Sequence, residues 1–179
     1  RGFQIMGDRP ASIYREQPSQ PYTRKAQNKR DNYVAGAPAP RVTQYEMGAR
    51  NKEFEQEVVL ISEEDCSIRS EALESGRVAA NSFLSKEFNM EEDYKLKIRP
   101  YPHHILRYHP LAGIAQADRY YEGMRKPFGR PIGRAAIVDE GDVVFKVSID
   151  SENVQEARKA LERTNHKMPV TCRVKLADS

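Results

Sequence analysis

The sequence contains no tryptophan, two cysteines and no long run of apolar residues. A helix that spans a membrane needs roughly 20 consecutive apolar residues, so we expect no membrane span. Residues 1–6 also lack the apolar segment of a signal peptide. Cys66 and Cys172 lie far apart, and two cysteines in 179 residues do not indicate a disulfide framework. These absences predict a protein of the reducing cytoplasm with no membrane partner.

Motifs of common catalytic and nucleotide-binding sites are also missing. The sequence has neither a Gly-x-Ser-x-Gly nor a His-Glu-x-x-His pattern, and acidic runs such as Glu63–Asp65 are typical of solvated turns. Gly113–Arg119 is rich in small residues but lacks the Lys-Ser/Thr pair of a P-loop, so we interpret it as a flexible loop rather than a nucleotide cradle. We therefore predict no enzyme, no cofactor and no small-molecule substrate.

The adjacent histidines His103 and His104 raise the question of a metal site. No Cys, Asp or Glu stands at ligand spacing, because the next histidine is His109 and the next acidic residue is Asp118. Neighbours in a strand point to opposite faces, so the pair could not easily share one ion. We expect no metal, with one histidine packed inward and the other facing RNA or water.

Positive and negative charges are unevenly distributed, although the whole chain carries a net charge of only +3. Residues 1–52 hold ten Lys and Arg against four Asp and Glu, and residues 94–136 hold nine against two. Residues 53–93 hold three against twelve. A polyanion could bind the two basic segments that flank the acidic one. Uneven charge without a partner is the alternative, since clustering alone is a coarse indicator.

Residues 1–52 show little hydrophobic periodicity and contain five prolines. Such a segment cannot bury enough apolar surface to offset the entropy lost on ordering, so we expect an extended arm that takes shape against a partner. Its basic cluster Arg24–Arg30 and its tyrosines, among them Tyr14 and Tyr22, suit pairing with phosphates and stacking on bases.

Residues 53–179 have the patterning of a single α+β domain. We expect strands at 58–61, 94–99, 104–108, 134–138, 143–149 and 170–176, helices at 70–88 and from Asp150 or Ser151 to 165, and a long loop at 109–133. The strands at 134–138 and 143–149 are predicted to pair as a hairpin across Asp139–Asp142. This order favours an antiparallel or mixed sandwich.

Two alternating segments give the direction of individual side chains. Tyr94–Arg99 alternates apolar residues with Lys95, Lys97 and Arg99, which predicts one strand face that carries three cations. In residues 170–176, Cys172 falls on the apolar face. We interpret it as a core thiol, since a reactive one needs a polar site that lowers its pKa.

The segment Gly123–Arg134 combines three glycines with four cations, Arg125, Lys126, Arg130 and Arg134. Glycine lets a backbone approach phosphates closely, and an arginine fork can bind two phosphate oxygens. A solvated loop would normally include balancing acidic residues, but none occurs between Met124 and Val138. The pattern favours contact with RNA over an ordinary solvated loop.

Several of these segments, in the same order, resemble the L10e family of archaeal and eukaryotic ribosomal proteins, the counterpart of bacterial L16. The matching segments are Pro10–Glu16, Pro21–Lys25, Glu71–Asn81, Asp93–Arg99, His103–Arg107, Ala117–Arg119 and Gly123–Gly129. They extend over nearly the whole chain. The family loop usually reads Gly-Ala-Gly-Ala-Asp-Arg, which Gly113–Arg119 replaces by Gly-Ile-Ala-Gln-Ala-Asp-Arg. By the same resemblance Met6 is a candidate start, and the short C-terminus suits an archaeal member.

The resemblance implies an α/β-hammerhead fold in the cytoplasmic large ribosomal subunit. It implies binding to large-subunit rRNA between the aminoacyl-tRNA site and the central protuberance, near 5S rRNA and neighbouring ribosomal proteins. The family's internal loop corresponds to residues 103–123 and is directed at the acceptor end of A-site tRNA, with Gly113, Asp118 and Arg119 closest.

The RNA-binding residues that we predict are cations, aromatic rings and histidines. They are Tyr14, Arg15, Tyr22, Arg24, Lys25, Arg50, Lys52, Arg77, Lys97, Arg99, His103, His104, Arg107, Arg125, Lys126, Arg130 and Arg134. The alternative hypothesis is a free-standing RNA-processing or RNA-modifying enzyme with the same basic surface. Such an enzyme would need a titratable cluster in a pocket.

Overall fold

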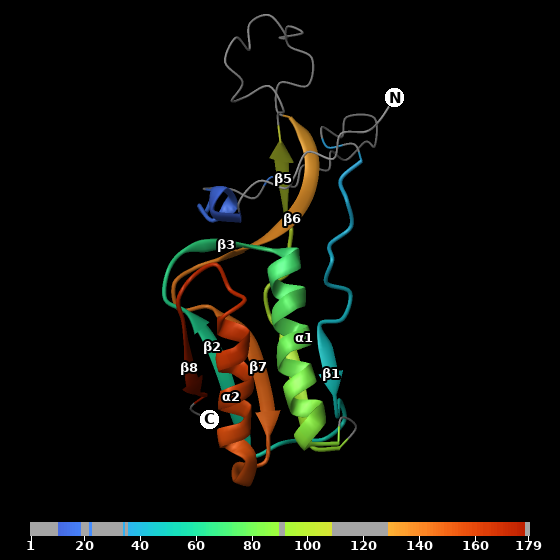
Figure 1. Cartoon of the computed structure of the whole chain (residues 1–179), viewed down its shortest axis with the longest axis vertical. Coiled ribbons are helices and arrows are strands. Elements are labelled where there is room, and N and C mark those ends of the chain that lie inside the picture. The colour runs from blue at the N-terminus through green and yellow to red at the C-terminus, as the bar shows by residue number, and fades with distance from the viewer. Residues whose placement is uncertain are drawn as a thin grey trace, which may run out of the picture.

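The computed structural model describes residues 11–18, 22, 34, 36–89, 92–108 and 129–177 of the chain (Figure 1). Its strands are β1 Glu46–Gly48, β2 Gln56–Ser62, β3 Cys66–Arg69, β4 Tyr94–Ile98, β5 His104–Tyr108, β6 Arg130–Val138, β7 Val143–Ile149 and β8 Cys172–Leu176. Its helices are α1 Ser70–Glu87 and α2 Val154–Asn165, with short 3-10 turns η1 Ala11–Tyr14 and η4 Ser151–Asn153. The predicted α+β class with two helices is confirmed.

The described strands form two antiparallel sheets. A five-stranded sheet has the order β1-β4-β7-β2-β8, and a three-stranded sheet has the order β3-β6-β5. Figure 1 shows α1 and α2 side by side over the five-stranded sheet, while β5 and the outer half of β6 extend beyond them. We call the five-stranded sheet with its two helices the body, and the paired strands β5 and β6 the ribbon.

The core of the body forms where apolar strand residues meet the apolar stripes of both helices. Leu60 and Phe145 from the sheet, and Leu73 and Leu161 from the helices, are fully buried. Each such side chain contributes roughly 1.5–3 kcal/mol by leaving water. Gly76 lets the helices pack closely, because a Cβ there would lie 3.0 Å from the Thr164 methyl group.

Gly48 allows β1 to pack against β4. Its φ of +92° belongs to the left-handed region, and a Cβ at this position would lie 2.1 Å from the Tyr94 carbonyl oxygen. The same oxygen accepts a hydrogen bond from the Ala49 N–H at 2.9 Å. Glycine is therefore required here both for the backbone angle and for the close approach.

The predicted hairpin between residues 134–138 and 143–149 is wrong, because these strands belong to different sheets. The turn itself exists, since the Asp142 N–H donates to the Asp139 carbonyl oxygen at 3.1 Å. Its Gly141 N–H donates to the Ser62 carbonyl oxygen at 2.9 Å. The turn is thus fixed to the end of β2, while β6 pairs with β3 and β5. At four residues, β3 is too short for an alternating pattern to predict it.

The ends of the predicted loop also need correction. β5 spans His104–Tyr108, which confirms the predicted strand at 104–108 and shortens the family-based loop 103–123. β6 begins at Arg130, inside the predicted loop 109–133. Pro131 and Gly133 make this part of β6 resemble a loop in sequence. The outer half of β6 pairs only with β5, however, and a strand with one free edge tolerates proline. Residues 109–128 lie outside the described part of the chain.

The second helix begins without the predicted side-chain cap. Neither η4 nor α2 has a side-chain hydrogen bond at its N-cap. The Asp150 carboxylate lies 3.0 Å from the Lys52 ammonium instead. The Asn153 N–H donates to the Asp150 carbonyl oxygen at 3.0 Å, so a 3-10 turn precedes α2.

The segment predicted as an arm joins the body before residue 52. Val42 and Met47 are buried in the core, and β1 pairs with β4, so packing begins ahead of the predicted boundary. Most of residues 1–35 lie outside the described part, and their extended form stays a prediction. Neither helix of the described part has the length and apolar character to cross a membrane.

Candidate RNA-binding surface

The predicted alternation of β4 is confirmed, and the sheet extends its row of cations. Tyr94, Leu96 and Ile98 are buried, whereas the lysines between them are partly exposed. Lys146 of β7 lies opposite Lys97, and Lys175 of β8 is placed in the same row through Val59. Only the register of the sheet could reveal this extension. The open face of the five-stranded sheet therefore gathers lysines from three strands.

Acidic residues neutralise part of this face. Glu46 of β1 lies opposite Lys97 and pairs with it, which lowers the pKa of Glu46 mainly through the hydrogen bond from the lysine. Lys146 pairs with Glu57 of β2. Like charges opposite one another destabilise a sheet, and these two carboxylates offset that repulsion between Lys97 and Lys146.

The arginines of the ribbon and its base have a different environment. Arg99, Arg130 and Arg134 do not meet a carboxylate at ion-pair distance among the described residues. Arg99 and Arg130 are exposed, and the Arg134 Nε donates to the Pro38 carbonyl oxygen at 2.8 Å. These guanidinium groups keep most of their donors for an external anion.

Tyr22, His104 and Arg107 meet along the outer edge of β5. The Tyr22 N–H donates to His104 Nδ1 at 2.9 Å, and the Tyr22 carbonyl oxygen accepts from the Ile105 N–H at 3.0 Å. The Arg107 guanidinium lies 3.8 Å from the centre of the Tyr22 ring. Burial, and then the charge of Arg107, lower the pKa of His104. His104 thus serves as a neutral acceptor that holds residue 22 against the strand edge.

Four other predicted RNA-binding cations have partners inside the protein. Arg15 pairs with Glu64, and Lys52 pairs with Asp150, in both cases near the surface. Exposed pairs of this kind contribute little and can exchange for phosphate. Arg50 donates to the Glu46 carbonyl oxygen at 3.3 Å.

Arg77 has the most internal environment of the four. Its guanidinium binds Glu74, which raises the pKa of Arg77, and it also contacts Met47. We interpret Arg77 as a residue that packs β1 against α1.

One of the remaining predicted site residues, Tyr14, has a described position, and several others do not. The Arg69 guanidinium lies 5.8 Å from the centre of the Tyr14 ring, beside β3. Arg24, Lys25, Gly113, Asp118, Arg119, Arg125 and Lys126 lie outside the described residues. Their roles stay predictions.

Sequence reasoning did not identify Tyr101, which lies between Tyr45 and His103. The ring centres of Tyr45 and Tyr101 are 5.4 Å apart, and those of Tyr101 and His103 are 4.6 Å apart. We call these three rings the aromatic tier. The signal was present in Pro100-Tyr101-Pro102, because prolines on both sides restrict the backbone that carries the ring.

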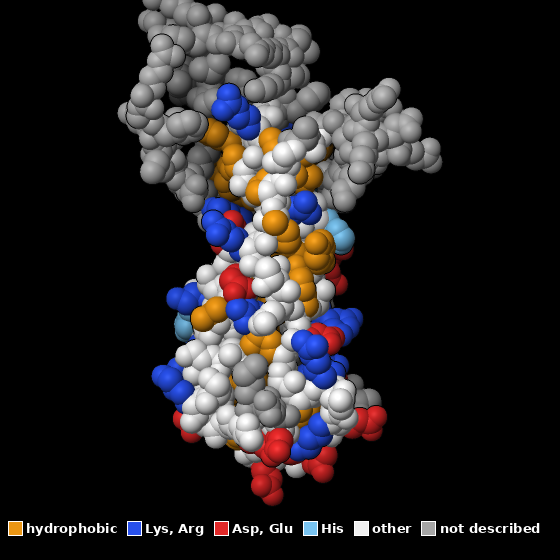
Figure 2. Space-filling model, turned by 90° about the vertical axis from the view of Figure 1, so that its right-hand side faces the viewer, with side chains coloured by type: hydrophobic (Ala, Val, Ile, Leu, Met, Phe, Trp, Pro, Cys, Tyr) orange, Lys and Arg blue, Asp and Glu red, His pale blue; other side chains and the backbone are white. Residues whose placement is uncertain are grey.

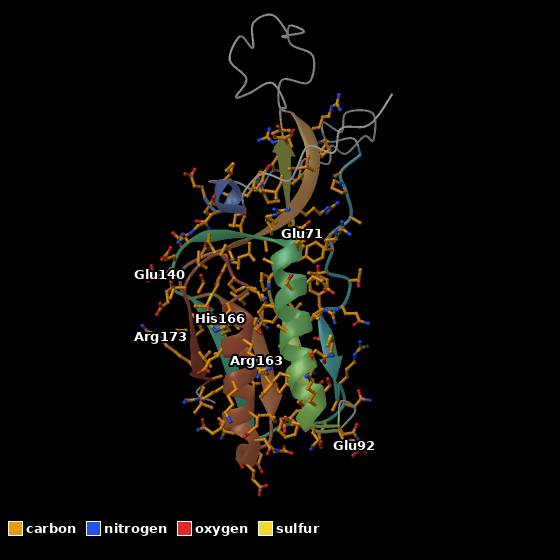
Figure 3. All side chains as sticks on the ribbon, viewed as in Figure 1. Glu71, Glu92, Glu140, Arg163, His166 and Arg173 are labelled. Carbon is orange, nitrogen blue, oxygen red and sulfur yellow. The ribbon has the colours of Figure 1, made fainter. Side chains whose placement is uncertain are left out.

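Besides a hollow of about 790 Å³ beside Arg50 and Lys52, the described surface has one of about 690 Å³ between α1 and α2. Arg163 and His166 lie beside it (Figure 3), and Glu74 also lines it. Arg163 lies 4.2 Å from the centre of the Phe83 ring, and Glu74 is paired with Arg77. Arg163 and Glu74 are thus already engaged, and His166 meets no carboxylate at ion-pair distance among the described residues. Among the described residues, no cluster of three metal-ligating side chains exists.

Cys172 is a core thiol, as its position in the alternating strand predicts. It is 6 % exposed, and burial raises the pKa of the thiol to about 11. Leu176, expected on the same apolar face, is 39 % exposed because it lies near the end of the edge strand β8.

Comparison with known proteins identifies the family. The ribosomal protein L16p/L10e family matches residues 17–175 of the chain. The chain belongs to this family. The L16p/L10e match includes both sheets, both helices and every cation that we placed on the ribbon. It confirms the predicted resemblance, and it favours a ribosomal protein over the alternative of a free-standing enzyme.

Curated relatives of this L16p/L10e protein are named large ribosomal subunit protein uL16. One from Staphylothermus marinus is 40% identical over 93% of this chain and 91% of its own length. Another from Archaeoglobus fulgidus is 40% identical over 94% of this chain and 92% of its own. One from Methanococcus maripaludis is 40% identical over 94% of both. The similarity is therefore to whole archaeal proteins and not to a shared fragment.

Proposed function

We propose that this L16p/L10e protein is a structural constituent of the cytoplasmic large ribosomal subunit that binds large-subunit rRNA through its ribbon. The observation that carries the proposal is that Arg99, Arg130 and Arg134 meet no carboxylate at ion-pair distance among the described residues. An rRNA backbone supplies the missing anions, and each phosphate contact releases condensed counterions. The lysines of the open sheet face, partly neutralised by Glu46 and Glu57, contribute less.

The family resemblance supports a finer placement. We propose that the rRNA lies between the aminoacyl-tRNA site and the central protuberance, near 5S rRNA. The part of residues 103–123 that lies beyond β5 then approaches the acceptor end of A-site tRNA, with Arg119 as the cation closest to it. Incorporation of Arg119→Ala protein into reconstituted subunits should lower A-site tRNA occupancy while rRNA binding stays unchanged.

The experiment for the ribbon is a salt series. Binding to a large-subunit rRNA transcript of Archaeoglobus fulgidus is measured by filter retention for the full chain and for the variants Arg99→Gln, Arg130→Gln and Arg134→Gln. Each variant should reduce the slope of log affinity against log salt by about 0.7–0.9, because one phosphate contact is lost.

Lys86→Gln is the matched control, since Lys86 is an exposed cation at the far end of α1. It should leave the slope unchanged. A loss of slope as large as that of the ribbon variants would mean that binding depends on total charge, and the ribbon assignment would be wrong. Wild-type protein that binds with a flat salt dependence would contradict the proposed function itself.

A further inference from the structure

We infer that Tyr101 and His103 form a stacking platform for an unpaired RNA base, beside the phosphate contacts of the ribbon. This inference rests on the proposed rRNA binding and names one residue-level mode within it. The aromatic tier is open to solvent. Tyr101 is 43 % exposed, His103 is exposed, and Tyr45 is half-buried beneath them. Rings in contact with one another and open to solvent form a contiguous patch, which is a candidate contact surface.

The backbone holds the tier in place before any partner binds. The Ile98 N–H donates to the Tyr45 carbonyl oxygen at 2.8 Å, and the Arg99 N–H donates to the Val144 carbonyl oxygen at 3.1 Å. The His103 N–H donates to the Tyr101 carbonyl oxygen at 2.9 Å across the buried Pro102. Prolines on both sides of Tyr101 further restrict the chain. Little entropy is therefore lost when a partner contacts these rings.

The charge around the tier favours RNA as that partner. No Asp or Glu occurs in the sequence from Tyr94 to Ala117. Arg99 stands two residues before Tyr101. Burial, and then Tyr101, raise the pKa of the Tyr45 phenol, and the nearby charge of Arg134 opposes this rise. Bases stack on aromatic rings while adjacent arginines pair with phosphates, which is a common mode of binding to single-stranded RNA. The segment that carries the rings therefore supplies cations without carboxylates, which suits a polyanion.

The tier lies where body and ribbon meet. Residues 99–103 connect β4 of the body to β5 of the ribbon. Figure 2 shows hydrophobic side chains beside a histidine on the narrow region between the two parts. A base held there would be contacted by both parts of the protein. The platform can therefore add a contact to a base, which phosphate contacts alone do not provide.

The test compares ring removal with charge removal on the same rRNA transcript. Tyr101→Ala and His103→Ala should each weaken binding, by about 5- to 100-fold for the loss of one stacked base. The salt slope should stay unchanged, because no phosphate contact is lost. Tyr101→Phe keeps the ring and should bind like wild type. Irradiation at 254 nm followed by mass spectrometry should find a nucleotide adduct on Tyr101 or His103.

Val78→Ala is the matched control, since Val78 is an exposed apolar residue on α1. Thermal unfolding checks that each variant is folded. If Tyr101→Ala does not fold, His103→Ala tests the platform independently. Wild-type binding with unaffected alanine variants would overturn the inference, and so would a reduced salt slope for Tyr101→Ala. If Tyr101→Ala bound rRNA normally but entered subunits poorly, the platform would contact a protein. Absence of wild-type binding would instead count against the proposed function.

Discussion

The body and the ribbon differ in how their positive charges are paired. In the body, several lysines and arginines of the sheet and helices meet carboxylates, as Lys97 meets Glu46 and Arg77 meets Glu74. In the ribbon and at its base, Arg99, Arg130 and Arg134 have no such partner among the described residues. Net charge alone would not separate these two sets. The difference indicates that part of the body's positive charge stabilises its own fold, while these three arginines are open to an external polyanion.

The largest expected effect is a loss of stability in the body. Gly48→Ala should lower the free energy of unfolding by more than about 2 kcal/mol, because it combines a positive φ with a contact of 2.1 Å to the Tyr94 carbonyl oxygen. Urea denaturation followed by circular dichroism measures the loss.

Gly141→Ala provides the control for this prediction. Gly141 has a φ of +89°, but a Cβ there meets no atom within 4 Å, so only the backbone term of about 1–2 kcal/mol applies. Equal losses for the two variants would show that the close approach of β1 to β4 does not matter.

The helices and some of the strands could be predicted from the sequence, but their pairing could not. The helix at 70–88 and the strand at 94–99 follow from periodicity, since one side of each faces the core. Pairing partners do not follow from periodicity. The turn at Asp139–Asp142 gives a strong hairpin signal, yet long-range pairing with β3 and β5 takes β6 into another sheet. The three-residue strand β1 carries no pattern at all, although its Gly48 is fixed by a non-local contact.

The candidate site divides in the same manner. Sequence identifies Arg99, Arg130 and Arg134 as cations in an acid-poor segment, and that is sufficient to predict a basic surface. It does not show that the Arg77 guanidinium is bound to Glu74, three residues earlier on the same helix. That pairing leaves fewer donors of Arg77 for RNA. Nor does it show that the nitrogen of His104 is occupied by a backbone N–H that lies 82 residues away.

A medium effect is expected at the ribbon edge. His104→Ala removes the acceptor for the Tyr22 N–H and should cost about 1 kcal/mol of stability. Because the pKa of His104 is lowered in the folded protein, stability should decline as pH falls below about 6.5, where the unfolded histidine becomes protonated. The decline should level off once the folded side chain is protonated too.

Chemical denaturation at pH 7.5 and pH 5.5 measures this dependence for wild type, His104→Ala and the exposed neighbour variant His103→Ala. Wild type and His103→Ala should lose stability together over this range, and His104→Ala should lose less. The same pH dependence in all three proteins would remove His104 as its source, and residue 22 would then be held by other contacts.

The smallest effect on stability is expected from a variant that frees Lys52 of its acidic partner. This variant is also the most direct test of the comparison between body and ribbon. Asp150→Asn removes the partner of Lys52, and both side chains are more than two-fifths exposed. An exposed pair contributes well under about 1 kcal/mol, so unfolding should change by a few tenths at most. If Lys52 is masked by Asp150 in the free protein, Asp150→Asn should strengthen rRNA binding at low salt.

Glu140→Gln removes one acidic charge from the exposed turn after β6 (Figure 3) and controls for net charge. Stronger binding by Asp150→Asn alone would mean that ion pairs of the body withhold cations from RNA. Equal gains in both variants would mean that only the total charge is sensed, and the distinction between body and ribbon would not extend to function.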